Sequence, residues 1–347
     1  MSQYRVRYDY RFDAPRQLEN YPMPTSRPRI VVIGAGMAGI LAGIKLLEAG
    51  LDNFTIYEKA DRVGGTWRDN TYPGLSCDTP SHHYTYTFAR NPGWSSYLPP
   101  GPEIQAYFEA TCDQYDVRRH IRFNEEVESA EFRDGQWQLV MKGGRRDSAH
   151  IVIAATGVLH HPSTPHIPGM ETFQGTLFHS AHWDHSVALD NRRVGVIGMG
   201  STGVQIISAL AGRAALVEHY VRTPQWIMPV QNTPYSEAQR DAFKRDPEAL
   251  AREMGTEEYL ANVNSYTQVI TQEDKEAIAY WRETCYRNLE DSVADPALRE
   301  QLRPDHEVLC KRLIFSPDYY EAIQRPGAAL VREDIQAIEA NGIRTVD

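Results

Sequence analysis

The chain has 347 residues, about the length of two globular domains or of two and part of a third. Hydrophobic residues make up 41% and charged residues 24%, which is ordinary globular usage and excludes an intrinsically disordered chain. The formal net charge is −10 at pH 7, the wrong sign for a protein that depends on phosphate-backbone contacts. We therefore expect a globular protein whose main partner is not a nucleic acid.

No sequence feature predicts a membrane segment or a disulfide-stabilised fold. The longest uncharged run, residues 30–44, is too short to cross a bilayer and contains several glycines. The four cysteines are widely spaced and form no Cys-x-x-Cys pair, so they indicate no disulfide framework, zinc site or redox dithiol. We expect reduced thiols, no bound metal and a cytoplasmic location.

The first part of the chain reads as a polar arm followed by a βαβ unit. Residues 1–28 are polar and show no periodicity. A buried-type strand over 30–33, a glycine-rich turn, a helix over 37–48 and a strand over 54–58 follow. Residues 60–100 are proline-containing and predict a long loop, and because such loops are more often functional than idle, we expect ligand contacts there.

The middle of the chain predicts a helix, a ribbon and a strand. The helix covers residues 103–115. Residues 121–141 alternate in the manner of an antiparallel ribbon around a turn at Asp134-Gly135. A strand over 150–155 ends this part of the chain.

A second βαβ unit follows, with a strand over 193–197, a helix that ends near residue 211 and a strand over 215–221. Residues from 235 to about 302 are charged and helix-prone, which predicts a helical insertion. The fold class expected from this order is α/β, with two Rossmann-like dinucleotide-binding domains and a helical insertion.

The first glycine turn fits the pattern G-x-G-x-x-G through Gly34, Gly36 and Gly39. Glycines at these places permit a tight turn and let backbone N–H groups and a helix N-terminus approach a pyrophosphate. Glu58 stands nineteen residues after Gly39, where a carboxylate accepts hydrogen bonds from the ribose of NAD or of the adenosine half of FAD. The alternative is a glycine-rich turn beside a surface glutamate.

The second turn carries the same pattern but the opposite charge at the ribose position. Arg222 stands nineteen residues after the last glycine, where a guanidinium suits the 2′-phosphate of NADP. The alternative for Arg222 is an ordinary solvated side chain. We therefore expect FAD at the first turn and NADPH at the second. The second turn contains Gly198, Gly200, Ser201, Thr202 and Gly203.

Two nucleotide sites imply hydride transfer from NADPH to a flavin, as in a disulfide reductase, an electron-transfer reductase or a monooxygenase. The absence of a paired dithiol in the sequence argues against the first. The division expected along the chain is an N-terminal arm (1–28), the first part of an FAD-binding domain (29–157), an NADP-binding domain (158–230), a helical insertion (231–303) and a return to the NADP-binding domain (304–347).

Two further motifs lie in the sequence, one in the long loop over residues 60–100 and one before the second glycine turn. Gly64-Gly65-Thr66-Trp67 is followed by Tyr72-Pro73-Gly74 and Asp78, and Phe173-x-Gly175-x3-His179-x3-Trp183-Asp184 precedes the second turn. Together they resemble the fingerprints of the type I Baeyer–Villiger monooxygenases, which are FAD- and NADPH-dependent flavoproteins. The resemblance runs from about residue 28 to the end of the chain.

The resemblance implies that NADPH reduces FAD, that O2 forms a C4a-peroxyflavin and that this species attacks a ketone to give an ester or lactone. Arg312, in Cys310-Lys311-Arg312, is implied as the catalytic guanidinium, with Asp78 orienting it beside the flavin. His179 and Trp183 are implied in domain motion. Flavin-side contacts are implied for Gly65, Thr66, Trp67, Tyr72 and Asp78, and contacts with the NADP 2′-phosphate for Arg222, Thr223 and Lys311.

Two other functions stay open from the sequence. One is a flavin monooxygenase that oxygenates nitrogen or sulfur. The other is an inactive FAD- and NADP-binding fragment, because the chain stops at Asp347, before the stretch in which this family returns to the FAD domain and completes the substrate pocket. The sequence also departs from the family pattern at Thr71, where many members carry a basic residue.

Overall fold

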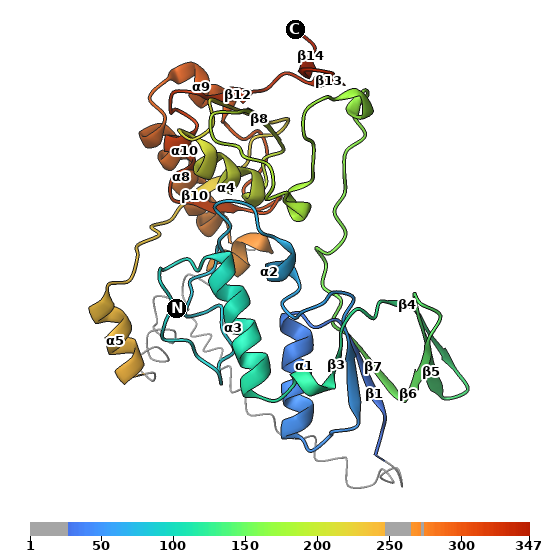
Figure 1. Cartoon of the computed structure of the whole chain (residues 1–347). Helices are drawn as coiled ribbons and strands as arrows, with labels where there is room; N and C mark the ends of the chain where they lie inside the picture. Colours follow the sequence, from blue (N-terminus) through green and yellow to red (C-terminus); the bar gives the residue numbers. More distant parts are fainter. Residues whose placement is uncertain (1–26, 247–264, 272–273) are drawn as a thin grey trace.

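The computed structural model describes residues 27–246, 265–271 and 274–347, and every statement below refers to these ranges. Nearly all of the expected N-terminal arm, and part of the expected helical insertion, lie outside the described residues. The chain is a mixed α/β protein in which two parallel sheets each carry a glycine-rich turn (Figure 1). This arrangement confirms the predicted fold class.

The first βαβ unit is present, with β1 (Ile30–Ile33), α1 (Met37–Glu48) and β2 (Phe54–Tyr57). Parallel pairing places β1 between β2 and β7 (Ile151–Ala154), so the apolar run of β1 is covered on both edges. Helix α1 buries Gly39, Ile40, Gly43 and Ile44, a helical spacing that turns one face towards the sheet.

One sequence prediction about this sheet is wrong. We expected Ile121 to begin the antiparallel ribbon, but β3 (Ile121–Arg122) pairs in parallel with β2, through Ile56 and Ile121. A strand of two residues has the same apolar–polar pattern whether it pairs with β2 or with the ribbon, so only tertiary contacts decide which strand it pairs with. The ribbon itself begins later and consists of β4 (Val127–Arg133), β5 (Gln136–Met141) and β6 (Arg146–Ala149).

The long loop between β2 and β3 contains two helices. Helix α2 (Thr66–Asp69) is a single turn, and α3 (Gly101–Gln114) begins with Pro102 in its first turn, where the missing N–H of proline costs no hydrogen bond. Helix α3 lies beside α1 over the first sheet (Figure 1). Apart from α2, residues 60–100 form turns and irregular structure, and most of their side chains are partly or fully buried.

The second βαβ unit consists of β8 (Arg193–Ile197), α4 (Ser201–Leu210) and β9 (Leu216–Tyr220). Strand β9 lies between β8 and β12 (Ala328–Val331), and all three strands are parallel. The chain therefore leaves this sheet after β9 and comes back to it more than a hundred residues later.

The intervening segment is mainly helical. A short parallel pair, β10 (Ile227–Pro229) with β11 (Ile314–Ser316), leads out of the second unit and back, and was not predicted from the sequence. Helix α8 packs on β10 and buries Trp281, Cys285 and Leu289 at a spacing of four residues. The helices here are α5 (Glu237–Arg245), a helical segment over 265–270, α8 (Lys275–Ser292), α9 (Pro296–Gln301) and α10 (Tyr319–Ala322).

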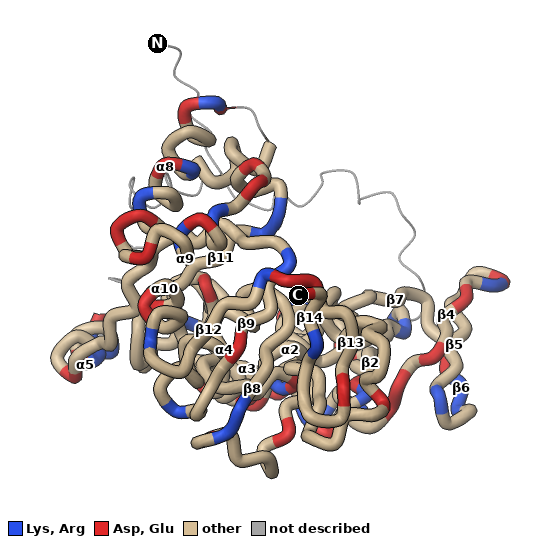
Figure 2. The backbone as a smooth tube through the Cα atoms, turned by 90° about the horizontal axis from the view of Figure 1, so that it is seen from above, with Lys and Arg blue, Asp and Glu red and all other residues tan. Residues whose placement is uncertain are grey.

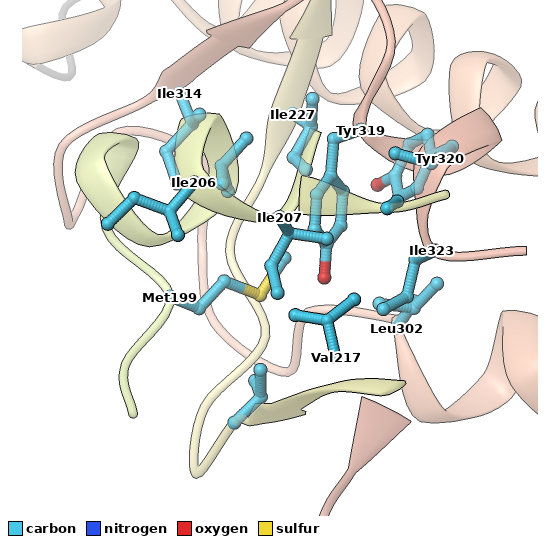
Figure 3. Close-up of a cluster of buried hydrophobic side chains, with 14 of the residues drawn as sticks. Met199, Ile206, Ile207, Val217, Ile227, Leu302, Ile314, Tyr319, Tyr320 and Ile323 are labelled. Carbon is cyan, nitrogen blue, oxygen red and sulfur yellow. The ribbon is translucent and has the colours of Figure 1, made fainter. Parts of the chain in front are cut away.

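The described chain ends in an antiparallel hairpin of β13 (Ile335–Glu339) and β14 (Gly342–Thr345). The second unit has its own hydrophobic core between α4, β9 and α10. Figure 3 shows Tyr319 in this core among Ile207, Val217 and Ile227. A separate core beneath α1 and α3 supports the first unit, so each glycine turn rests on a rigid base.

Candidate functional site

The first glycine turn joins β1 to α1 and can be built only with glycine at two of its places. Gly34 has a φ of +99°, and a Cβ there would lie 2.5 Å from the carbonyl oxygen of Ala155. A Cβ on Gly39 would lie 1.8 Å from the carbonyl oxygen of Gly34. At Gly36 a Cβ would only approach Gly65, at 3.6 Å. The turn is therefore tight inside and leaves the N-terminus of α1 accessible.

Glu58, the expected ribose partner, is buried and holds the first turn. Its Oε2 accepts a hydrogen bond from the backbone N–H of Ala35 at 2.8 Å, and its Oε1 lies 2.9 Å from Nη1 of Arg68. Only 4% of Glu58 is exposed. The carboxylate thus fixes the loop that would approach a pyrophosphate, and Arg68, which the sequence analysis did not single out, compensates its buried charge.

The Gly64-Gly65-Thr66-Trp67 segment packs directly on the first turn. The N–H of Gly64 donates to the carbonyl of Ala35 at 3.0 Å, and Gly65 precedes α2 with a φ of +55°. Trp67, within α2, donates its indole N–H to the hydroxyl of Tyr84 at 2.9 Å. Two glycine-rich backbone segments from different parts of the chain therefore face each other, and a Cβ on Gly65 would lie 3.1 Å from the Cα of Gly36, which would push them apart.

The second glycine turn is more open than the first. Gly198 has a φ of +107°, and a Cβ on Gly203 would lie 2.1 Å from the Gly198 carbonyl oxygen. A Cβ on Gly200 would meet no described atom within 4 Å. The hydroxyl of Ser201, at the start of α4, is buried and has no hydrogen-bond partner among the described residues. An open backbone beside an unpaired hydroxyl fits a phosphate group.

The Tyr-Pro-Gly motif connects the two units. Tyr72 is 7% exposed and belongs to the core of the second unit. Its hydroxyl donates to Oε1 of Gln205 at 3.0 Å and accepts from Thr202 at 3.3 Å. Gln205 also donates to the carbonyl of Ser76 at 3.0 Å. The structure therefore places Tyr72 against helix α4, and its expected contact with the flavin stays a prediction.

Asp78 and Arg312 form a salt bridge, although they are 234 positions apart in the sequence. The distance between Arg312 Nη2 and Asp78 Oδ2 is 2.9 Å, and the two side chains are 72% and 19% exposed. The hydrogen bond to Asp78 raises the pKa of Arg312 above its ordinary value. The site therefore holds a fixed, permanently charged guanidinium that is still accessible.

The pairing of β10 with β11 explains how Arg312 reaches this place. The N–H of Ile314 donates to the carbonyl of Trp226 at 3.1 Å, so the segment before β11 runs beside the segment that follows β9. Lys311 lies on the first of these segments and Arg222 and Thr223 on the second, and both basic side chains are exposed. The β10–β11 pairing thus brings together the two chain segments that carry the residues expected at the 2′-phosphate.

His179 and Trp183 lie on the segment between the two units. His179 precedes a single 3-10 turn (Ser180–His182) and accepts the N–H of Ala181 on Nδ1 at 3.0 Å, so it acts as a cap. Trp183 packs edge to face on Phe178 and lines a cavity of about 480 Å³. Arg62, Arg68, Asp69, Thr71 and His182 also line this cavity.

Thr71, where the sequence departs from the family pattern, forms a different link. Its hydroxyl lies 2.8 Å from Nε2 of His185. The histidines at 179, 182 and 185 do not gather into a metal site, and in the described ranges no three His, Cys, Asp or Glu side chains are grouped to hold an ion. Likewise, no helix within the described ranges is both long and apolar enough to cross a membrane.

His219 and Gln205 are the main residues that sequence reasoning missed around the second turn. His219 is fully buried in strand β9, whose sequence Leu-Val-Glu-His-Tyr also contains Glu218, so the sequence alone did not mark the histidine as the buried polar side chain. Gln205 lies in the first turns of α4, where a solvent-facing glutamine looks the same in sequence. Its contacts with the Tyr72 loop depend on the docking of two units, which no local pattern specifies.

The fold and these turns define the class: an α/β protein with two dinucleotide-type turns and an Asp78–Arg312 pair that joins the long loop to the segment before β11. A family model for flavin-binding monooxygenase-like proteins matches residues 27–238. The chain belongs to the flavin-binding monooxygenase-like family.

Individual relatives agree with this family. An uncharacterized monooxygenase of Mycobacterium tuberculosis is 44% identical over 328 residues, covering 92% of this chain and 64% of its own length. A Baeyer–Villiger monooxygenase of Streptomyces coelicolor is 35% identical, covering 92% of this chain and 61% of its own. The chain therefore spans less than two thirds of the length of these relatives.

A solved structure shows the same likeness. The crystal structure of cyclohexanone monooxygenase from Rhodococcus sp. Phi1 bound to NADP+ is 32% identical, with a TM-score of 0.78. The alignment covers 92% of this chain and 67% of that structure. The part of the chain matched by the family model, residues 27–238, includes both glycine turns described above.

Proposed function

We propose that this chain binds FAD at the first glycine turn and NADPH at the second, and that it serves a Baeyer–Villiger monooxygenase. Such an enzyme uses NADPH and O2 to insert one oxygen atom next to a ketone carbonyl, giving an ester or lactone. The family supports the flavin, and the NADP+ held by the similar solved structure supports the nicotinamide nucleotide. The open backbone at Gly200 and the unpaired Ser201 hydroxyl support a phosphate at the second turn.

The Asp78–Arg312 pair carries the proposal. Bound flavin would supply the redox chemistry, namely acceptance of a hydride and activation of O2. Arg312 contributes a positive charge that stabilises negative charge developing on oxygen during the attack on the carbonyl. Asp78 holds the guanidinium in place, so little reorganisation is needed when that charge develops.

The expected division of the chain is part of this proposal. Residues 29–157 would form the first part of the FAD-binding domain, residues 158–230 the NADP-binding domain and residues 231–303 an insertion. Residues 304–347 would return to the NADP-binding domain, which the parallel pairing of β12 with β9 supports. Within it we assign Arg222, Thr223 and Lys311 to the 2′-phosphate.

His179 and Trp183 are proposed as conformational residues. Both lie on the segment that connects the two units, and Trp183 packs against the core of the second unit while lining a cavity with residues of the first. A movement of one unit relative to the other would therefore change the surroundings of Trp183.

Replacing Arg312 with alanine tests the proposed chemistry. We expect ester formation from a ketone, measured by mass spectrometry, to fall by about 100-fold or more, the size seen when a charge-stabilising group is removed. Anaerobic reduction of the flavin by NADPH, followed by absorbance, should persist. As a control, Arg213→Ala removes a guanidinium that pairs with Asp190 on the surface of the second unit and should leave both rates unchanged.

Three results would contradict the proposal in different ways. Oxygenation of sulfides or amines without any ester from ketones would assign the chain to N- or S-oxygenation. Bound FAD that releases only hydrogen peroxide would favour an FAD- and NADP-binding chain without oxygenation activity. Full ketone oxygenation by the Arg312→Ala protein would remove the proposed role of Arg312.

A further inference from the structure

Gly198, the first glycine of the second turn, is hydrogen-bonded through both its N–H and its carbonyl group. Its N–H donates to the carbonyl of Tyr220 at 3.0 Å, and its carbonyl oxygen lies 3.0 Å from Nε2 of His219. His219 belongs to β9 and is 0% exposed. Its other ring nitrogen, Nδ1, lies 2.9 Å from the hydroxyl of Tyr319, which is 1% exposed at the start of α10. A buried chain of two hydrogen bonds therefore ends on the turn.

The direction of these hydrogen bonds follows from the chemistry of the groups. A carbonyl oxygen only accepts, so Nε2 of His219 carries the hydrogen that reaches Gly198. Burial lowers the pKa of His219 to about 4, which keeps the ring neutral at pH 7 and leaves Nδ1 as an acceptor. Burial also raises the pKa of Tyr319 well above its ordinary value, so its hydroxyl keeps the proton that it donates to Nδ1.

The first turn provides an internal comparison, because it is built without an imidazole. The N–H of Gly34 donates to the carbonyl of Tyr57 at 2.8 Å, just as Gly198 donates to Tyr220. The residue before Tyr57 is Ile56, fully buried, and it takes the position in the strand that His219 takes in β9. An apolar side chain at this position is therefore compatible with a glycine turn.

Burying an imidazole costs free energy unless both ring nitrogens are hydrogen-bonded, whereas burying an isoleucine has no such requirement. Both ring nitrogens of His219 have partners here. In return, the ring restrains the peptide group between Gly198 and Met199, whose N–H lies on the far side of the same planar unit. The next residues are Gly200, which is open, and Ser201, whose buried hydroxyl is unpaired within the described chain. The restrained peptide thus directly precedes the two residues whose open backbone and unpaired hydroxyl fit a phosphate.

We propose that His219, held by Tyr319, is a positioning residue that orients the turn from Gly198 to Gly203 for the pyrophosphate of NADP(H). It sets the affinity for the nicotinamide nucleotide without touching it. The flavin turn has Ile56 in its place, so flavin affinity does not depend on the same chain of hydrogen bonds. This inference rests on the proposed function, since it requires the nucleotide to bind at the second turn.

Binding measurements on the FAD-loaded chain test the inference. We expect His219→Ile, which copies Ile56, to raise the Kd for NADP+ by about tenfold, the effect of losing one buried hydrogen bond. Calorimetric titration with NADP+ gives this value, and the Kd for FAD should stay within about twofold of the wild type. His219→Gln places an amide donor near the same position and should restore most of the NADP+ affinity.

Tyr319→Phe keeps the ring in the core and removes only the hydroxyl, so it tests the second link even if His219→Ile does not fold. We expect it to raise the Kd for NADP+ by about two- to threefold, with unchanged FAD binding. Unchanged NADP+ affinity in both Tyr319→Phe and His219→Ile would overturn the inference. A parallel loss of FAD and NADP+ affinity would also overturn it, since that marks general destabilisation. Absence of NADP+ binding by the wild-type chain would overturn the proposed function, and this inference with it.

Discussion

The buried ring of His219 makes the stability of the second unit depend on pH. Its pKa in the folded chain is about 4, below the ordinary value of 6.5, because burial penalises the charged form. The unfolded chain therefore binds a proton at higher pH than the folded chain does. Above about pH 7 the stability does not change with the titration of His219, and as the pH falls from 6.5 towards 4 the free energy of unfolding decreases by about 3 kcal/mol in all.

Urea unfolding at pH 7 and pH 5 measures this effect. Between these values we expect His219 to account for a loss of about 2 kcal/mol in the free energy of unfolding. His219→Gln removes the titrating group, so its stability should fall less than that of the wild type. His82, whose pKa is also lowered to about 4, is present in both proteins and cancels in the comparison. Equal losses in the two proteins would contradict the assignment.

The sequence predicted single residues best where a local pattern defines the role. The spacing of Gly34 and Gly39 predicts a turn that only glycine can make, and the structure contains it. The partnership of Asp78 with Arg312 came from the family resemblance, because no periodicity connects residues so far apart. His219 was missed for the same physical reason: its partner Tyr319 is brought to it by folding, 100 residues later in the chain.

At the scale of elements, the loop that contains Tyr72 and Gly74 docks on helix α4. Gly74 has a φ of +81°, and a Cβ there would lie 2.7 Å from the carbonyl oxygen of Gln205 and 3.1 Å from the Cβ of Ala209. Glycine at this position therefore satisfies both the backbone conformation and the close approach of the helix. The contact joins the loop of the first unit to the helix that begins at the second glycine turn.

Comparing Gly74→Ala with Gly212→Ala distinguishes the cost of the positive φ from the cost of the close contact with helix α4. Gly212 has a similar φ of +87°, but a Cβ there would meet no described atom within 4 Å. We expect Gly212→Ala to cost about 1 kcal/mol in the free energy of unfolding, from backbone strain alone. Gly74→Ala should cost about 2 kcal/mol more, because the helix and the loop must also move apart. Equal costs in urea unfolding would show that the loop does not need this close contact.

Helices and strands were predicted correctly where the hydrophobic pattern of the element itself identifies it. The prediction failed where the identity of a strand depends on which other strand it pairs with. Both βαβ units follow from apolar strands, glycine turns and helical spacing, all of which are local. The strand at Ile121–Arg122 was assigned to the wrong partner, and the pair of β10 with β11 was not foreseen. These strands have two or three residues each, too few for alternation to specify a partner.

At the scale of the whole molecule, charge is dispersed over the described chain while the net charge is strongly negative. Figure 2 shows acidic and basic residues interspersed over the described chain, with no single region of one sign. Against this background, Arg222 and Lys311 are exposed on the two segments that β10 and β11 bring together. An acidic protein that binds a nucleotide with an extra phosphate needs such a local reversal of charge, because phosphate is otherwise repelled.

Nucleotide preference tests this arrangement. We expect Arg222→Ala and Lys311→Ala each to raise the Kd for NADP+ by about tenfold, as for loss of a charged hydrogen bond, because only NADP+ carries the 2′-phosphate. The Kd for NAD+, measured in the same titrations on the FAD-loaded chain, should change by less than about twofold. Arg213→Ala, which removes an arginine already paired with Asp190, is the matched control and should alter neither value. If the Arg222 and Lys311 variants raised the Kd for NADP+ and the Kd for NAD+ equally, the two side chains would not contact the 2′-phosphate. They would instead attract anions in general, and rising salt would remove that attraction for both nucleotides alike.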